Sequence, residues 1–331
     1  MCAGAFALVS FDLTISSALA ETYTTFDVPN SNLTEPAGIN DNGDATGLFM
    51  PSAGGFFTGF IRSSDGTFTT FAVKNSLGTT PSVINGKGEI VGDWDGEYGF
   101  NGFLRKSDGT ILDIDPRHLG GGVRPPNITA LRINDAGTIA GGFTDNDGME
   151  KGFLRKANGK TATYGVTGTP VTQPYGLNST GAVTGYYWNI DDNTYVGFVR
   201  VPDGTITTFG IPDASRTVPV AISDSGTVTG YYDHPTSSGF VRSPDGTVVS
   251  FDPPGSQQTN PIAINRKGEI AGHWFDGTHF HGFIRSAHGK ITSFDPPDSK
   301  STTVTGMNRN GVVIGIYGGT DGRGHGFIRM P

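Results

Sequence analysis

Short apolar stretches rich in β-branched and aromatic residues recur along the whole chain and are separated by turn residues. Thr205–Phe209 is typical of these stretches, because Thr, Ile and Phe favour the pleated, half-buried surface of a strand. No stretch shows the sustained apolar period of 3.6 residues that an amphipathic helix requires. We therefore expect an all-β protein with essentially no helix in the mature chain.

One tetrapeptide, Gly-Phe-(Ile/Leu/Val)-Arg, occurs seven times at nearly even intervals. Its copies end at Arg62, Arg105, Arg155, Arg200, Arg242, Arg285 and Arg329, so the steps are 43, 50, 45, 42, 43 and 44 residues. A period in this range is typical of a repeat architecture. Because no linker or shift in composition interrupts the repeats, we expect one domain over residues 21–331.

Two turn motifs accompany the tetrapeptides. The first is Asn-x-x-Gly followed four residues later by Gly, at Asn40, Asn85, Asn134, Asn178, Asn265 and Asn308, with Ser223 in the fifth repeat. The second follows the Arg, at Asp65-Gly66, Asp108-Gly109, Asn158-Gly159, Asp203-Gly204, Asp245-Gly246 and His288-Gly289. Asn and Asp bond to their own downstream backbone and Gly accepts positive φ, so both motifs predict tight hairpins.

Each repeat therefore predicts four antiparallel strands, which is the blade of a β-propeller. A parallel β-helix is the alternative, but its coils are shorter and would not need two hairpins in every repeat. We expect a seven-bladed β-propeller of four-stranded antiparallel blades.

The two ends of the chain predict how the ring closes. The last repeat ends after Gly326–Arg329 and lacks a fourth strand, whereas Thr22–Pro29 matches the fourth-strand pattern of Ile206–Pro212. Pairing the N-terminal strand with the last repeat would hide two exposed sheet edges. We expect this N-terminal strand to complete the last blade.

Composition and charge narrow the functional classes. The 51 Gly and 20 Pro are spread along the chain, which favours many tight turns over low-complexity disorder. The net charge of −8 leaves no basic surplus for phosphate groups, so we expect no binding to nucleic acid. We also expect a monomer that does not insert into a membrane.

Residues 1–20 are typical of a signal peptide. Ala3–Ala20 is mostly small and apolar and ends in Ala18-Leu19-Ala20, an A-x-A-type cleavage site. The alternative is a disordered N-terminal tail, since no Lys or Arg precedes the apolar run and Asp12 interrupts it. Export would make the protein secreted or periplasmic. Cleavage would also remove Cys2, the single cysteine, and with it any possible disulfide.

The repeats resemble those of the HAF family of bacterial extracellular proteins, named for a recurring His-Ala-Phe. The tripeptide stands here as His281-Gly282-Phe283 and His325-Gly326-Phe327. The resemblance covers all seven repeats and implies an exported, propeller-like protein. It brings neither a catalytic residue nor a substrate.

Residues that recur in every repeat are interpreted first as scaffold. An aromatic residue stands two positions after the second Gly of each repeat, at Phe49, Trp94, Phe143, Tyr187, Tyr232, Trp274 and Tyr317. These rings could stack on ligands, but bulky filler between blades explains them better. The repeated Arg would lie against the following turn. The His of the repeat, His281 and His325, would pack or form hydrogen bonds.

Departures from the repeat are the better candidates for a binding site. The longer connections between blades share one face, here called the variable face, and loops on a rigid scaffold commonly carry binding sites. The 50-residue step inserts residues 116–126, which contain Arg117, His118 and Arg124. Arg132 stands on an innermost strand where the other repeats have Gly, Ala or Val. We expect Arg132 to point into the channel and bind an anionic group such as a carboxylate; the alternative is a side chain satisfied by backbone carbonyls.

A second variable position follows the second Gly of each repeat. Four of its residues, Asp93, Tyr186, Tyr231 and His273, could converge on a ligand from four blades. His273, His279 and His281 lack a recognised zinc spacing, and the Asp-rich turns at Asp93 and Asp145 lack the spacing of a calcium loop. No nucleophile elbow or phosphate-binding loop occurs. We expect no cofactor and no metal.

The favoured function is that of an exported binding module for a polysaccharide or a cell-surface protein. The alternative is a polysaccharide lyase or hydrolase at the variable face, with His118 or His273 and Tyr186 or Tyr231 as acid and base and Arg132 on a uronate carboxylate. The two functions require different arrangements of side chains. An enzyme needs a His or Tyr within hydrogen-bond reach of the Arg132 neighbourhood, whereas a binding module could distribute its contacts among the blades.

Overall fold

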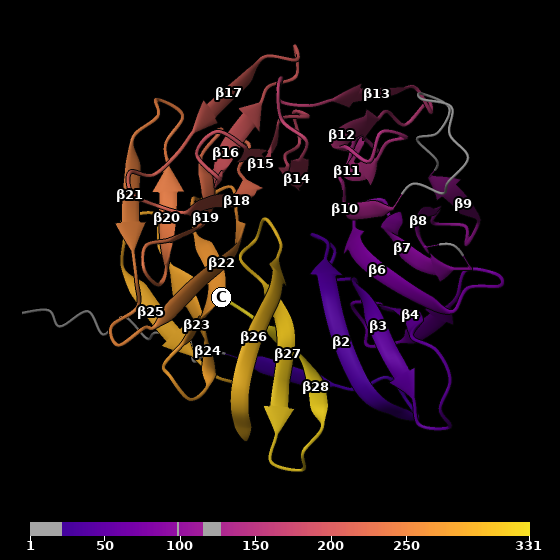
Figure 1. Ribbon diagram of the computed structural model, residues 1–331. Coiled ribbons are helices and arrows are strands. Elements are labelled where there is room, and N and C mark those ends of the chain that lie inside the picture. The colour runs from indigo at the N-terminus through magenta and orange to yellow at the C-terminus, as the bar shows by residue number, and fades with distance from the viewer. Residues whose placement is uncertain (1–21, 98, 115–126) are drawn as a thin grey trace, which may run out of the picture.

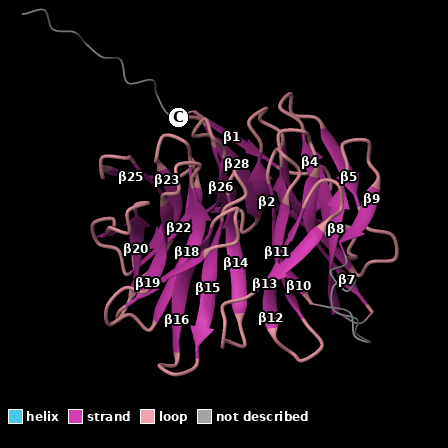
Figure 2. Cartoon of the chain, turned by 90° about the horizontal axis from the view of Figure 1, so that it is seen from above, coloured by secondary structure: helices cyan, strands magenta, loops and turns pink. Residues whose placement is uncertain are grey.

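The computed structural model describes residues 22–97, 99–114 and 127–331. Over these residues the chain consists of strands joined by turns, without a helix, so the expected all-β class is confirmed (Figure 2). The signal peptide expected at residues 1–20 and the insertion at 116–126, with His118 and Arg124, lie outside the described residues.

The strands form four-stranded antiparallel units, which Figure 1 shows arranged around a central axis. The first strands, which face the axis, are β2 (Ser31–Ile39), β6 (Gly78–Ile84), β10 (Ile128–Ile133), β14 (Thr172–Leu177), β18 (Arg216–Ile222), β22 (Gln258–Ile264) and β26 (Ser299–Met307). The second strands are β3 (Ala45–Pro51), β7 (Ile90–Gly96), β11 (Ile139–Thr144), β15 (Val183–Asn189), β19 (Val228–Asp233), β23 (Ile270–Phe275) and β27 (Val313–Gly319).

The outer half of each unit carries the repeated tetrapeptide and the short strand after it. The third strands are β4 (Thr58–Arg62), β8 (Gly99–Arg105), β12 (Glu150–Arg155), β16 (Thr194–Arg200), β20 (Ser237–Arg242), β24 (Phe280–Arg285) and β28 (Gly324–Arg329). The fourth strands are β5 (Phe68–Phe71), β9 (Ile111–Ile114), β13 (Thr161–Tyr164), β17 (Ile206–Phe209), β21 (Val248–Phe251) and β25 (Ile291–Phe294). Units are named below by their strands.

The first strand of the chain, β1 (Tyr23–Phe26), lies antiparallel to β28, with Tyr23 opposite Arg329 and Phe26 opposite Gly326. In the other units the strand after the tetrapeptide occupies this place, as β17 does beside β16. A Cβ at Gly326 would lie 2.7 Å from the Phe26 ring. The glycine is therefore required because an aromatic ring of the neighbouring strand covers it.

The tetrapeptide builds the contact between neighbouring units. Its Phe is fully buried in every copy, and its Arg stacks on an aromatic ring, which lies on the fourth strand of the preceding unit or, for Arg62, on β1. The stacked pairs are Arg62–Phe26, Arg105–Phe71, Arg200–Tyr164, Arg242–Phe209, Arg285–Phe251 and Arg329–Phe294, at 4.7–5.1 Å from the guanidinium carbon to the ring centre. Arg155 differs because the corresponding residue is Ile114. These arginines therefore join units.

The repeated Asn forms the inner turn and links it to the next unit. Asn40 Oδ1 accepts hydrogen bonds from the backbone N–H groups of Asn42 and Asp44, at 3.0 and 2.9 Å. The side-chain amides donate to the turn carbonyl of the following unit in the pairs Asn40–Asn85, Asn85–Asn134, Asn134–Asn178, Asn178–Ser223 and Asn308–Asn40. Ser223 is too short to continue this series.

Candidate functional site

The first strands enclose a central channel with two cavities along it. One cavity, of about 220 Å³, opens at the face of the repeated Asn turns, and the other, of about 240 Å³, lies further inside. Five apolar side chains line both cavities, namely Ile39, Leu177, Ile222, Ile264 and Met307. This ring of apolar side chains lies between the turn-side mouth and the part of the channel that contains Arg132.

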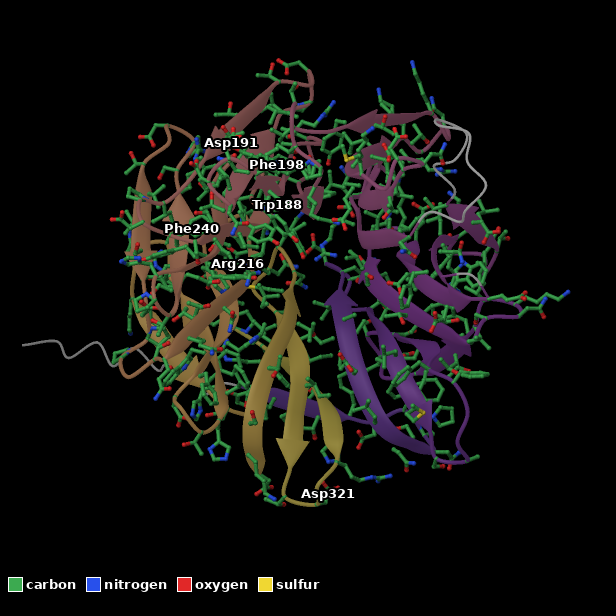
Figure 3. All side chains as sticks on the ribbon, viewed as in Figure 1. Trp188, Asp191, Phe198, Arg216, Phe240 and Asp321 are labelled. Atoms are coloured by element: carbon green, nitrogen blue, oxygen red, sulfur yellow. The ribbon has the colours of Figure 1, made fainter. Side chains whose placement is uncertain are left out.

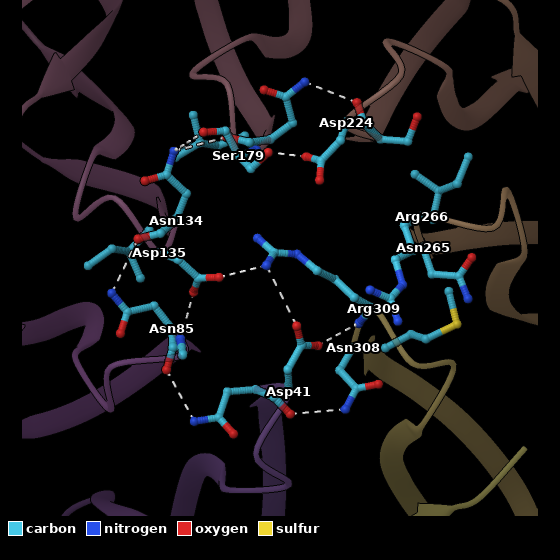
Figure 4. Close-up of a pocket in the computed structure, with 18 of the residues that line it drawn as sticks. Asp41, Asn85, Asn134, Asp135, Ser179, Asp224, Asn265, Arg266, Asn308 and Arg309 are labelled. Atoms are coloured by element: carbon cyan, nitrogen blue, oxygen red, sulfur yellow. Dashed lines mark hydrogen bonds and ion pairs between the residues drawn. The ribbon is translucent and has the colours of Figure 1, made fainter.

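The turn-side mouth is held by contacts within the protein (Figure 4). Arg309 reaches across it, with Nη1 at 2.7 Å from Asp135 Oδ2 and 3.6 Å from Asp41 Oδ2. Asp224 accepts a hydrogen bond from the backbone N–H of Ser179 at 2.9 Å. Burial raises the pKa of Asp224, but these hydrogen bonds and the charge of Arg309 outweigh it and leave the pKa below its usual value. The charged groups of this mouth thus stabilise one another.

Arg132 lies on β10 and lines the inner cavity, as the sequence predicted for a side chain on an innermost strand. Its Nη1 donates a hydrogen bond to the carbonyl of Leu131 at 3.0 Å. Burial lowers the pKa of Arg132, whereas the nearby phenol of Tyr175 raises it. No carboxylate of the described residues forms an ion pair with Arg132. Both interpretations of Arg132 therefore hold in part. One N–H group is bonded to a backbone carbonyl, and among the described residues the charge that lines the channel has no carboxylate partner.

Tyr175, which sequence reasoning missed, occupies a bulge in β14. The register of β14 against β15 shifts between Pro174 and Gly176, and Tyr175 is the extra residue. Five of the other first strands carry Ala37, Ser82, Val220, Ile262 and Thr305 at the corresponding bulge position. In the sequence, the signal for Tyr175 is a large polar aromatic residue at a position where these other repeats have smaller side chains.

Tyr175 begins a row of tyrosines that crosses the β14–β17 unit. Its ring stacks on Tyr186 of β15 with centroids 5.7 Å apart and an angle of 28° between the ring planes. Tyr186 meets Tyr195 of β16 edge to face at 5.2 Å and 88°. Tyr195 is 37% exposed. We call Tyr175, Tyr186 and Tyr195 the tyrosine row; it runs outward from the channel across three strands of one unit.

Arg216 of β18, which Figure 3 labels, joins the tyrosine row to the next unit. Its guanidinium carbon lies 5.6 Å from the ring centre of Tyr195 and 5.7 Å from that of Tyr231. Its Nη2 donates to the Tyr231 hydroxyl at 3.2 Å, and its Nη1 lies 3.4 Å from Asp233. The Nε of Arg216 is buried without a hydrogen-bond partner. The fold thereby places a second arginine beside the tyrosines.

The phenols of Tyr186 and Tyr231 remain neutral near pH 7. Burial raises the pKa of Tyr186, and the neighbouring Tyr175 adds to the effect. Burial likewise raises the pKa of Tyr231, partly opposed by the charge of Arg216. These tyrosines can therefore donate hydrogen bonds and present ring faces, but they are poor bases.

Two further candidates from the sequence, Asp93 and His273, lie apart from this cluster in the contacts of the described residues. Burial raises the pKa of Asp93 to about 6, and the charge of Asp95 adds to the rise. Burial lowers the pKa of His273 to about 4, although a hydrogen bond to the backbone of Val304 opposes the change. His273 packs against Phe280 with ring centroids 5.5 Å apart. Of the proposed residues, Arg132, Tyr186 and Tyr231 surround Tyr175.

The residues considered as zinc or calcium ligands make ordinary turn and surface contacts. His281 lies between Asp295 and Asp276, at 2.7 and 3.3 Å from their carboxylate oxygens. Asp145 accepts hydrogen bonds from the backbone N–H groups of Asp147 and Met149 and pairs with Lys151. No cluster of three or more metal-ligating side chains occurs among the residues that the structure describes.

No protein-family model matches the chain, and no curated protein matches it. Solved structures do resemble it. Virginiamycin B lyase from Staphylococcus aureus superposes with a TM-score of 0.62 at 15% identity, covering 94% of this chain and 100% of the lyase. The β-propeller domain of the Trilobed protease from Pyrococcus furiosus gives 0.66 at 11% identity, covering 90% and 95%. A puromycin hydrolase gives 0.64 at 13% identity, covering 90% of this chain and 55% of the hydrolase.

The fold is a β-propeller. Because every one of these identities lies below 25%, the likeness concerns the fold, and the activities in those names belong to the proteins that carry them. In the described part of the chain, no helix is long and apolar enough to cross a membrane.

Proposed function

We propose that this protein is an exported binding propeller that recognises an acidic saccharide at the variable face. The tyrosine row and Arg216 form the binding surface, and Arg132 in the channel adds a second positive charge. We further propose that the protein belongs with the HAF-family repeat proteins. Its place of action would be secreted or periplasmic.

The observation that carries the proposal is the association of Tyr195 with Arg216. A half-exposed aromatic ring offers a flat apolar surface, on which the face of a sugar ring can stack. A guanidinium beside that ring can donate a charge-assisted hydrogen bond to a carboxylate. Saccharides that carry uronate groups combine both features.

We also propose that the ring has seven blades and that β1 completes the last one. Three contacts support this arrangement: Phe26 covers Gly326, Arg62 stacks on Phe26, and the Asn308 amide donates to the Asn40 carbonyl at 3.0 Å. Each contact repeats one that neighbouring units make elsewhere in the chain. A closed ring holds the tyrosine row and Arg132 at fixed positions around the channel.

Binding is favoured over catalysis because two of the tyrosines that interact with Tyr175, together with His273, are unsuited to proton abstraction. The pKa values of Tyr186 and Tyr231 are raised by burial, so these phenols stay protonated at neutral pH. His273, the histidine proposed as an acid or base, packs on Phe280 and contacts Val304 rather than the tyrosine row.

Titration calorimetry with oligogalacturonate, compared with neutral cello-oligosaccharides, tests the proposal. Tyr195→Ala should weaken binding of the acidic oligosaccharide by about 2- to 10-fold, the loss of one aromatic contact of about 0.5–1.5 kcal/mol. Arg132→Ala should weaken it by about 10- to 100-fold, the loss of a charge-assisted hydrogen bond of about 1.5–3 kcal/mol.

Phe100→Ala is the matched control, because Phe100 is an exposed aromatic residue at the position of Tyr195 in the β6–β9 unit. It should leave the affinity unchanged. Equal binding of oligogalacturonate by the wild type and both site variants would refute the site. Release of unsaturated or reducing ends during the titration would show catalysis, and the lyase or hydrolase function would then replace the proposed binding function.

A further inference from the structure

A groove of about 580 Å³ lies between the β10–β13 and β14–β17 units, away from the tyrosine row. One wall is the β12–β13 turn with Lys156 and Lys160, and the other includes Thr180, Arg200 and Pro202 of the next unit. The volume falls within the range of about 300–1,000 Å³ that is usual for ligand sites.

Three cations line this groove, and no Asp or Glu lines it. Among the described residues, the ammonium groups of Lys156 and Lys160 have no carboxylate partner. Arg200 stacks on Tyr164 at 4.9 Å and donates to the carbonyl of Val201 at 3.4 Å. Asp203 of the following turn is exposed, and its pKa is lowered mainly by hydrogen bonds from Thr205, with a smaller effect from the charge of Arg200. The groove is therefore a positive area on a protein of net charge −8.

The preceding unit shows what this turn looks like when its charges are balanced. There Lys106, which corresponds to Lys156, forms an ion pair with Glu89 at 2.7 Å. In the β10–β13 unit the residue at the position of Glu89 is Thr138, so the lysine has lost its partner.

Two more changes in the same turn act in the same direction. Asp108 of the β6–β9 unit is replaced by Asn158, and Thr110 by Lys160. Asp108 carries a carboxylate whose pKa is lowered mainly by hydrogen bonds to Thr110, with smaller effects from Lys106 and Arg105. Relative to the β6–β9 unit, the β10–β13 unit has thus lost two acidic groups and gained a basic one around this turn, and these changes coincide with a groove.

We propose that this groove is a second binding site, which holds an acidic polysaccharide by its charges. The lining between the cations consists of small side chains, among them Ala136, Ala157, Ala162 and Thr161, which allow a chain of sugar rings to lie close to the backbone. The groove lining contains no aromatic residue, so stacking cannot dominate here as it does at the tyrosine row. Charged groups on successive sugars match cations spaced along the groove, and such binding weakens as salt rises.

The test uses size-fractionated dextran sulfate oligosaccharides as the probe, with unsulfated dextran as the neutral polymer of the same backbone. The double variant Lys156→Ser/Lys160→Thr introduces residues that other units carry at these positions, such as Ser243 and Thr205. It should bind dextran sulfate at least 10-fold more weakly than the wild type in a titration at low salt. Thr138→Glu should weaken binding while retaining both lysines, because it restores the carboxylate that neutralises Lys106 in the preceding unit.

The matched control is Lys106→Ser/Lys290→Thr, which removes the same net charge from equivalent turns of two other units. An equal loss of affinity in the control and the groove variant would overturn the proposal in favour of non-specific attraction. Wild-type binding that is absent, or that unsulfated dextran reproduces, would also overturn it. Tyr195→Ala should leave dextran sulfate binding intact, so failure at the tyrosine row and failure at this groove can be told apart.

Discussion

The guanidinium carbon of Arg62 lies 5.1 Å from the ring centre of Phe26, although the two residues belong to the third strand of one unit and the first strand of the chain. Arg242 has the same relationship to Phe209 of β17, at 4.7 Å. Phe26 therefore occupies, relative to Arg62, the place that a fourth-strand aromatic residue occupies relative to Arg242.

Phe26→Ala should destabilise the protein by about 3–5 kcal/mol, the usual cost of truncating a buried Phe. The ring packs on Phe60 and Phe68, covers Gly326 and supports Arg62, so its removal opens the contact between β28 and β4. Chemical denaturation followed by tryptophan fluorescence measures the loss. Phe209→Ala, the equivalent change in the β14–β17 unit, should cost a similar amount. A Phe26→Ala protein as stable as the wild type would contradict the role given to β1.

Ser223→Asn should stabilise the protein by about 1 kcal/mol, the usual net value of one hydrogen bond. Ser223 interrupts the series of side-chain amides that donate to the next unit, and Asn at this position could reach the Asn265 carbonyl as Asn178 reaches that of Ser223, at 3.0 Å. The midpoint of urea unfolding should rise. The reverse change, Asn308→Ser, should lower it because it removes the bond to Asn40. Opposite shifts in both variants would show that the amide series does not stabilise the ring.

His325 should make stability fall as the pH rises above about 6.5, the ordinary histidine pKa. Burial lowers the pKa of His325, but Asp321 and Asp27, with oxygens 3.1 and 2.8 Å from its ring nitrogens, outweigh burial and raise it. A raised folded-state pKa means that the contribution is complete below the unfolded value and disappears as the pH passes the folded value.

Unfolding midpoints of the wild type and His325→Gln, measured between pH 5 and 9, check this dependence. The difference between the two proteins should shrink as the pH rises. His288→Gln serves as the control, because exposed His288 has no carboxylate partner among the described residues. A difference that stays constant with pH would rule out a protonated His325 in the contact with Asp27.

Asp93→Asn should stabilise the protein at pH 7.5 by about 1–3 kcal/mol, since one pKa unit corresponds to about 1.4 kcal/mol and the side chain is only partly buried. Burial raises the pKa of Asp93 to about 6, so the folded protein loses stability as the pH rises from the ordinary aspartate value of about 4 through 6. At pH 4 the variant and the wild type should be nearly equal. Thermal unfolding at both pH values measures the effect, with exposed Asp113→Asn as the control. A variant less stable than the wild type at pH 7.5 would show that the Asp93 carboxylate is favourably bound.

The repeated scaffold could be predicted from the sequence because its signals are local. Gly326 marks a place where a ring covers the backbone, and Asn40 marks a turn that its own side chain closes. Each such residue is required by contacts within a few residues or by one neighbouring strand. The repetition of these residues then gave the strand number of each unit and the antiparallel pairing.

The candidate site could be predicted only in part, because its residues converge from different units. Arg132 was recognisable as a large charged side chain among small ones. Tyr175 depends on a bulge that redirects one side chain, and Tyr195 meets Arg216 only after two units are placed side by side. No spacing within one repeat encodes such a contact.

The pairing of β1 with β28 has a consequence for how the protein is made. The hydrogen bond from His325 to Asp27 spans 298 positions of the chain, so β1 finds its partner only after every other unit has been synthesised. Contacts this distant in sequence form slowly, because a long loop must close before they stabilise anything. Until then, the unpaired edges of β28 and β1 are open to strands of other molecules. The newly made chain is therefore most vulnerable to aggregation in the interval before its two ends meet.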